Sequence, residues 1–153
     1  MELGDQVSNF TFSATNQLNG QLSDYKNKTL VLYFYPKDAT PGCTTEGQDF
    51  RDAYPQIEAL NAVVFGISRD SLKSHENFKA KQNFPFELIS DKEGKLCELF
   101  DVIKMKSMYG KQFLGIERST FIINGSGVLQ EEWRKVSVKG HVQEVIESLK
   151  QLA

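Results

Sequence analysis

Two continuous apolar runs stand out in the first half of the chain. Residues 29–35 and 62–68 contain few polar side chains and are rich in Val, Tyr and Phe. Runs of this kind are typical of strands that are buried on both faces, as in a parallel sheet covered by helices. The sequence therefore predicts at least two neighbouring strands in the interior of an α/β fold.

Two other segments predict β-hairpins. Residues 10–14 alternate apolar with small or polar side chains, and Asn19 and Gly20 follow as a pair suited to a tight turn. Residues 119–133 are apolar on both sides of the sequence Asn-Gly-Ser-Gly at 124–127, which is a good hairpin signal. We expect one hairpin at the N-terminus and one shortly before the C-terminal segment.

Helical periodicity occupies most of the remaining chain. Apolar residues recur at helical spacing over about 43–60, where Pro55 is expected to kink the helix because proline lacks a backbone donor. Further helices are predicted over 71–82, over about 92–100, and from about 140 to the end, where one apolar stripe persists. The predicted order is a hairpin, then strand, helix, strand and helix, then a hairpin and a closing helix.

Composition narrows the class of protein. A length of 153 residues suits a single domain over 1–153, and no linker or low-complexity segment divides it. A net charge of −2, with 40% hydrophobic and 25% charged residues, gives no reason to expect a nucleic acid or a membrane as partner. The acidic start lacks a signal-peptide pattern, so we expect a cytoplasmic protein, and we expect it to be a monomer.

The chain contains two cysteines and two histidines. Cys43 and Cys97 are too few for a disulfide scaffold, and a cytoplasmic protein is expected to keep them reduced. His75 and His141 lie far from the cysteines and from each other, without the short paired spacing of zinc ligands. We therefore predict no metal site and no cofactor.

Cys43 lies in the most informative segment of the chain. Residues 35–46 read Tyr-Pro-Lys-Asp-Ala-Thr-Pro-Gly-Cys-Thr-Thr-Glu, so an apolar run ends in a turn rich in Pro and Gly that leads into the predicted helix. The first turn of a helix has free N–H groups and the positive end of the helix dipole, which favour an anion such as a thiolate. Cys43 is thus either a small buried side chain or an activated nucleophile, and its surroundings favour the second.

The same segment carries a family resemblance. Pro36, Thr40 and Cys43 match the Pro-x-x-x-Thr-x-x-Cys motif of the peroxiredoxins. The surrounding sequence resembles that of the bacterioferritin comigratory protein, or peroxiredoxin Q, subfamily. The likeness continues through 65–71, 108–111 and 115–121 and covers nearly the whole chain. Four separated motifs in the order of the subfamily make the resemblance specific.

The resemblance implies a fold and a reaction. The implied fold is an α/β, thioredoxin-like three-layer structure with a mixed central sheet and an N-terminal β-hairpin extension. The implied activity is reduction of hydrogen peroxide and organic hydroperoxides, with Cys43 as the nucleophile that becomes a sulfenic acid. Thr40 would hydrogen-bond the thiolate or the peroxide, Pro36 would shield the thiolate from water, and Arg118 would supply a cation.

Ordinary structural roles remain open for the same side chains. Pro36 and Thr40 are common turn residues, and an arginine before a strand is usually a solvated surface charge. Glu46 could tune the thiol, although we prefer a simple interaction with the helix N-terminus. The lysines within 104–111 are expected to form a solvated basic loop.

The sequence departs from its relatives in the second cysteine. Many members of the subfamily carry a resolving cysteine five residues after the first, where this chain has Gln48, and others carry it in the stretch that corresponds to 71–84, which contains none. Cys97 is the remaining candidate, but it lies among apolar helix positions and is more simply a core residue. We therefore expect a one-cysteine cycle in which thioredoxin, glutaredoxin or glutathione reduces Cys43.

Two other functions compete with a peroxidase. A dithiol oxidoreductase of the thioredoxin type would need a Cys-x-x-Cys pair, and Cys43 is followed by Thr-Thr-Glu. A redox sensor or chaperone-like protein switched by oxidation of Cys43 would use the same thiol without turnover.

Overall fold

The computed structural model describes residues 1–153 and contains one large sheet, a separate hairpin and four α-helices. The large sheet consists of β1 (Thr11–Ala14), β2 (Leu18–Gln21), β3 (Thr29–Phe34), β4 (Ala62–Ser68), β5 (Glu87–Ser90), β8 (Ser119–Ile123) and β9 (Leu129–Arg134). The helices are η1 (Leu22–Tyr25, a 3-10 turn), α1 (Pro41–Ala59), α2 (Leu72–Gln82), α3 (Lys95–Leu99) and α4 (His141–Leu152). The separate hairpin consists of β6 (Ile103–Met108) and β7 (Lys111–Ile116).

The two apolar runs form the centre of the sheet, as predicted. The strand order is β2-β1-β5-β4-β3-β8-β9, and β3 pairs in parallel with β4, with Phe34 opposite Ile67. On its other side, β3 pairs antiparallel with β8, with Phe34 opposite Ser119. The carboxyl ends of β3 and β4 and the amino end of β8 therefore meet at one edge of the sheet.

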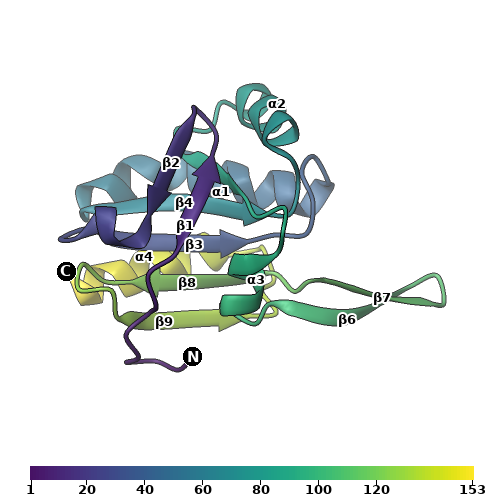
Figure 1. The fold of residues 1–153 in the computed structure, drawn as a ribbon. Coiled ribbons are helices and arrows are strands. Elements are labelled where there is room, and N and C mark those ends of the chain that lie inside the picture. The colour runs from purple at the N-terminus through teal and green to yellow at the C-terminus, as the bar shows by residue number, and fades with distance from the viewer.

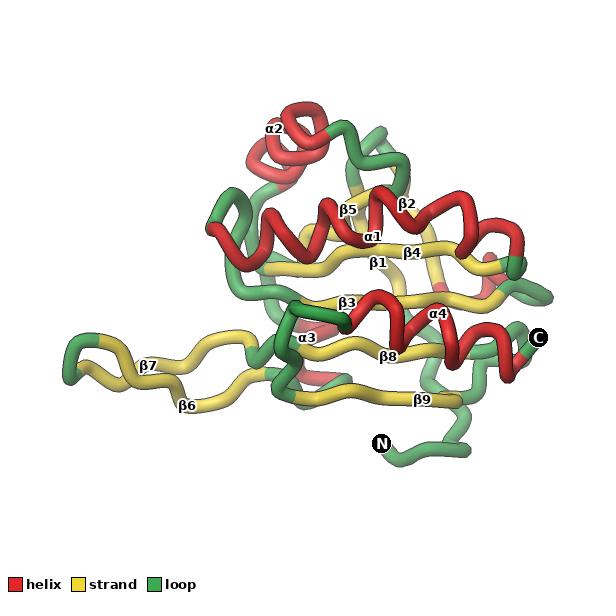
Figure 2. The backbone as a smooth tube through the Cα atoms, turned by 180° about the vertical axis from the view of Figure 1, so that it is seen from behind, coloured by secondary structure: helices red, strands yellow, loops and turns green.

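Helices and loops cover both faces of the sheet (Figures 1 and 2). In Figure 2, α1 and α4 lie together in front of β3, β4 and β8, and α3 lies on the other side. The core is accordingly divided into two clusters of 19 buried residues each, one containing Cys43 and the other containing Cys97. None of the helices combines the length and the apolar character needed to cross a bilayer.

The predicted helices are present, with one correction. α1 continues through Pro55 as one element, α2 is capped by Ser71, and α4 buries its apolar stripe. The helix predicted over 92–100 is confined to α3, because the chain first turns at Gly94, which has a φ of 75°. The carboxylate of Asp91 then accepts hydrogen bonds from the N–H groups of Leu96 and Cys97, which fixes the start of the helix.

The hairpin predicted over 119–133 is present as β8 and β9, whereas the N-terminal hairpin and the basic loop required correction. The N-terminal hairpin exists, but Asn19 and Gly20 lie inside β2, and the turn is formed by Asn16 and Gln17, whose φ values are 60° and 56°. Phe12 explains this register, because its ring lies against Gly20 in the opposite strand and leaves no room for a side chain there. The expected basic loop within 104–111 is in fact the β6–β7 hairpin, which projects from the body of the molecule (Figure 1).

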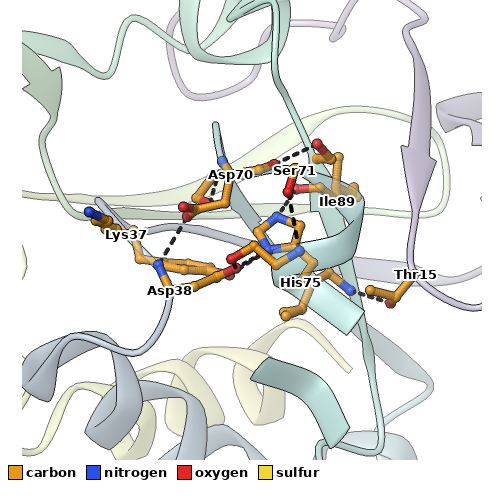
Figure 3. A network of polar contacts seen from close by, with 12 residues as sticks. Thr15, Lys37, Asp38, Asp70, Ser71, His75 and Ile89 are labelled. Atoms are coloured by element: carbon orange, nitrogen blue, oxygen red, sulfur yellow. Dashed lines mark hydrogen bonds and ion pairs between the residues drawn. The ribbon is translucent and has the colours of Figure 1, made fainter. Parts of the chain in front are cut away.

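A buried polar network ties the loop after β3 to α2 (Figure 3). The carboxylate of Asp38 accepts hydrogen bonds from the hydroxyl groups of Tyr35, at 2.6 Å, and Ser74, at 2.8 Å. Nδ1 of His75 lies 2.7 Å from the same carboxylate, and the backbone N–H of Asp38 donates to Asp70. The loop that leads to Cys43 is therefore anchored by both side-chain and backbone hydrogen bonds.

The partners of His75 determine its charge. Its Nε2 lies 2.9 Å from the carbonyl oxygen of Ile89, which can only accept, so this nitrogen must donate. Burial alone would raise the pKa of Asp38, but the hydrogen bonds from His75 and Tyr35 hold it below its ordinary value, so Asp38 is ionised. His75 consequently donates through both nitrogens and forms a fully buried ion pair with Asp38.

We expect the substitution His75→Leu to lower the free energy of unfolding by about 3–5 kcal/mol, because it leaves the Asp38 carboxylate buried without its counter-charge. Equilibrium unfolding in urea measures this change. The matched control is Lys150→Ala, which removes the exposed pair with Glu147 and should cost less than about 1 kcal/mol. A loss for His75→Leu as small as that of the control would contradict a buried ion pair.

Candidate active site

Cys43 lies in the first turn of α1, as the sequence predicted. Thr40 is the N-cap residue, and the N–H of Thr44 donates to the Thr40 carbonyl at 2.9 Å and so closes the first turn. The N–H groups ahead of Thr44 have no partner within the helix and surround the Cys43 thiol with positive partial charge. Only 2% of Cys43 is exposed, which limits how much water can screen this effect.

Arg118 reaches Cys43 from a distant part of the chain. Because Ser119 pairs with Phe34, the residue before β8 lies beside the end of β3, where the loop to Cys43 begins. Nη2 of Arg118 lies 3.4 Å from Cys43 Sγ, within donor distance of the sulfur. Gly42 permits this approach, since a Cβ at that position would lie only 3.2 Å from the same nitrogen.

Glu46 holds the other arm of the guanidinium group. Its Oε1 accepts a hydrogen bond from Arg118 Nη1 at 2.6 Å, and the side chain is completely buried. The expectation that Glu46 merely favours the helix N-terminus was therefore wrong. Its position three residues after Cys43, almost one helical turn along α1, directs both side chains toward Arg118.

Burial dominates the electrostatics of Glu46. Desolvation raises the pKa of Glu46 to about 7, although the neighbouring Arg118 opposes this shift. Its second carboxylate oxygen, Oε2, has no hydrogen-bond partner, which adds to the cost of charging it. The hydroxyl group of Tyr33 is also buried without a partner, and burial, followed by the charges of Glu46 and Cys43, raises the pKa of Tyr33 well above its ordinary value.

The charge of Arg118 affects two further basic residues. Burial and then Arg118 lower the pKa of His141 to about 4, so His141 is neutral at physiological pH and does not add to the cationic field. Burial and Arg118 also lower the pKa of Lys106, while Cys43 raises it. The charges of the site therefore act on this lysine of β6. The sequence had assigned Lys106 to a solvated loop.

Thr40 and Pro36 lie in the loop that carries Cys43 to its position. The Thr40 hydroxyl donates to the carbonyl oxygen of Lys37 at 2.8 Å, and no hydrogen bond joins it to the thiol. This bond spans Ala39, whose φ of 63° lies in the left-handed region that non-glycine residues rarely adopt. Pro36 is half-buried and directly follows Tyr35, the last residue of the apolar run 29–35.

Cys97 lies on the opposite face of the sheet from Cys43. It belongs to α3 and is completely buried in the second core cluster. Burial and the adjacent Asp91 raise the pKa of its thiol well above the ordinary range, so it stays protonated. A disulfide between Cys43 and Cys97 would require one of them to leave its side of the sheet.

Sequence reasoning overlooked one cluster with metal-ligand atoms. Oxygen and nitrogen atoms of Asp38, Asp70 and His75 lie within 4.8 Å of one another, although Asp38 is distant from the other two in the chain. Each of the three side chains is already hydrogen-bonded to protein groups, including Tyr35 and Ile89. The arrangement is therefore that of an internal ion-pair network, and only the parallel pairing of β3 with β4 brings it together.

Comparison with known proteins identifies the family of the chain. A family model described as the AhpC/TSA family matches residues 3–132. Peroxiredoxin Bcp of Bacillus subtilis is 50% identical over 153 residues, which cover 100% of this chain and 98% of the relative. Peroxiredoxin Bcp of Xanthomonas campestris is 49% identical over 150 residues, which cover 98% of this chain and 94% of the relative.

Solved structures show the same likeness. A cysteine-to-serine mutant of Xylella fastidiosa PrxQ superposes with a TM-score of 0.95 at 49% identity, covering 99% of this chain and 97% of that one. The bacterioferritin comigratory protein of Xanthomonas campestris, studied for alkyl peroxide reduction, gives a TM-score of 0.89 at 50% identity, with 94% and 91% covered. These neighbours confirm the thioredoxin-like fold. The chain belongs to the AhpC/TSA family, as a peroxiredoxin of the bacterioferritin comigratory protein, or peroxiredoxin Q, group, and it is therefore a thiol-dependent peroxidase.

Proposed function

We propose that Cys43 is the nucleophile of this peroxidase and that Arg118 is the cation that activates it. The observation that carries the proposal is the 3.4 Å contact between Arg118 Nη2 and Cys43 Sγ at the N-terminus of α1. A guanidinium group and free helix N–H groups both favour the thiolate over the thiol. Only 2% of Cys43 is exposed, so little water lies between these groups and the sulfur.

The first half-reaction then follows. The Cys43 thiolate attacks one peroxide oxygen, the S–O bond forms, and the O–O bond breaks. The leaving oxygen takes the electron pair and a proton and departs as water or an alcohol, while Cys43 becomes a sulfenic acid. Arg118 stabilises the negative charge as it moves from sulfur to the leaving oxygen.

Three other residues support this step in the proposal. Glu46 fixes the guanidinium group of Arg118 through its 2.6 Å hydrogen bond to Nη1, so that Nη2 stays directed at the sulfur. Thr40 is the N-cap residue of α1, and in the proposal its hydroxyl group exchanges its hydrogen bond to the Lys37 carbonyl for one to the incoming peroxide. Pro36 has no N–H and a rigid ring, which suits it to cover the thiolate without binding water.

The second half-reaction uses an external thiol in this proposal. Cys97 is a poor resolving residue because it is protonated, buried and on the other face of the sheet. The sulfenic acid on Cys43 is therefore reduced by thioredoxin, glutaredoxin or glutathione, and the protein follows a one-cysteine cycle. A cytoplasmic location and a monomeric state stay predictions.

We expect one equivalent of hydrogen peroxide to add a single oxygen to the reduced protein, mapped to Cys43, because no second thiol can reach the sulfenic acid. Intact-mass spectrometry measures this gain. Cys97→Ala should give the same product, and Cys43→Ser should give none. Loss of two hydrogens in the native chain, abolished in Cys97→Ala, would contradict the one-cysteine cycle.

We expect Arg118→Gln to lower kcat/KM for peroxide by about 10²–10³-fold, because the stabilisation of the developing charge is lost. Steady-state peroxide consumption with dithiothreitol measures the change. The double substitution Arg118→Gln with Glu46→Gln avoids an unpaired buried carboxylate and should be equally slow. Arg51→Gln, which removes a partly exposed pair with Asp52 and a hydrogen bond to the Gln82 carbonyl, is the control. A double variant as active as this control would exclude Arg118 from the proposed role.

We expect the native protein to lose stability relative to Glu46→Gln as the pH rises from 4.5 to about 7. The raised pKa means that the folded state binds the Glu46 proton more tightly than the unfolded state does. The free energy of unfolding is therefore greatest below the pKa of Glu46 in the unfolded state, and it falls as the pH rises through the pKa in the folded state. The difference should reach about 2–3 kcal/mol. Urea unfolding at several pH values measures it, and parallel curves for the two proteins would contradict the raised pKa.

A further inference from the structure

The β6–β7 hairpin, residues 103–116, forms an arm that leaves the body of the molecule (Figures 1 and 2). Its two strands pair only with each other and belong to no other sheet. An isolated two-stranded hairpin has little stability of its own in water, because it lacks a layer against which to bury an apolar face. Beyond Ile103 and Ile116 at its base, which contact the core, the arm is therefore a surface that the rest of the chain does not cover.

Large apolar side chains are exposed along the arm. Met105 and Leu114 lie opposite each other in the pairing and are 61% and 62% exposed, and Tyr109 at the tip is 97% exposed. Met108 and Phe113 add further exposed area on the other face. Most of the exposed large hydrophobic residues of the whole chain lie in this short segment, and such a concentration is typical of an interaction surface.

The arm is also strongly basic. Residues 103–116 contain Lys104, Lys106 and Lys111 and no acidic residue, whereas the whole chain has a net charge of −2. A surface that combines apolar area with one sign of charge attracts a partner of the opposite charge and orients it during the encounter. The complementary partner is therefore a protein with an acidic surface around an apolar contact area.

The arm lies next to the candidate active site. β7 ends at Ile116, two residues before Arg118, and the charges of both Arg118 and Cys43 affect the pKa of Lys106 in β6. A protein bound along the arm would consequently have one edge at the Cys43 pocket. In a thiol peroxidase, the partner that must reach this cysteine is the one that delivers electrons to it.

We propose that the β6–β7 arm is the docking surface for an acidic dithiol protein that reduces Cys43, an inference that rests on the proposed one-cysteine cycle. A second copy of the chain fits the arm less well. A symmetric dimer would place the same patch on both subunits, so one basic arm would face the other, and of its lysines only Lys104 is paired with an acidic residue, Asp101.

The chemistry of the docked complex balances without a further reactant. One thiolate of the partner attacks the sulfenic sulfur of Cys43, an S–S bond forms, and the S–O bond breaks to release hydroxide, which takes up a proton to give water. The partner's second thiolate then attacks its own sulfur in the mixed disulfide. Cys43 leaves as a thiolate, and the partner is left with an internal disulfide.

Thioredoxin, kept reduced by NADPH and thioredoxin reductase, is the probe, and dithiothreitol is the small-thiol reference. We expect Met105→Ser with Leu114→Ser, and separately Lys111→Glu, to raise KM for thioredoxin about tenfold or more. Turnover with dithiothreitol should stay unchanged in both variants, because a small thiol does not need the arm. Lys28→Glu, an exposed lysine at the opposite end of β3, is the charge control and should change neither rate.

Each outcome decides between the possibilities. Unchanged KM for thioredoxin in both variants, or turnover of the native chain with glutathione but not with thioredoxin, would overturn the docking proposal. Sedimentation equilibrium adds a further test: a native dimer that becomes monomeric on Met105→Ser with Leu114→Ser would assign the arm to self-association instead. Failure of the native chain to turn over even with dithiothreitol would count against the proposed catalytic cycle as well.

Discussion

The pairing of β3 with β4 on one side and β8 on the other is the constraint on which the site depends. Parallel pairing brings the end of β4, with Asp70 after it, beside the loop that follows β3. Antiparallel pairing brings Arg118, just before β8, to the same edge. Cys43 is delivered there by α1, so a nucleophile and its cation meet although 75 positions separate them in the chain.

Two buried carboxylates organise this edge in different ways. Asp38 receives hydrogen bonds from several donors and a charged His75, which keep its pKa low and anchor the loop. Glu46 has one cationic partner, Arg118, and one oxygen without a partner, so burial dominates and its pKa is close to neutrality. One pair therefore fixes the backbone, whereas the other sets the position of the guanidinium group beside the thiol.

Local sequence signals succeeded where short-range chemistry decides the outcome. The two apolar strands, the capped α2 and the stripe of α4 are present as predicted, because each pattern requires only that its own apolar positions be buried. The turn at Asn19 and Gly20 failed because Phe12 packs over Gly20, which makes Asn16 and Gln17 the turn. The β6–β7 arm escaped prediction because its apolar residues alternate with lysines and, beyond Ile103 and Ile116 at its base, contact no core.

The sequence by itself determined that Cys43 begins a helix after a buried strand, that its motif is that of a peroxiredoxin, and that Gln48 replaces a common second cysteine. These features are local, so neighbouring residues are sufficient to define them. Only the tertiary structure decided that Glu46 is buried against Arg118 and that Cys97 lies behind the sheet. The burial and charge of these side chains depend on partners that strand pairing brings from distant parts of the chain.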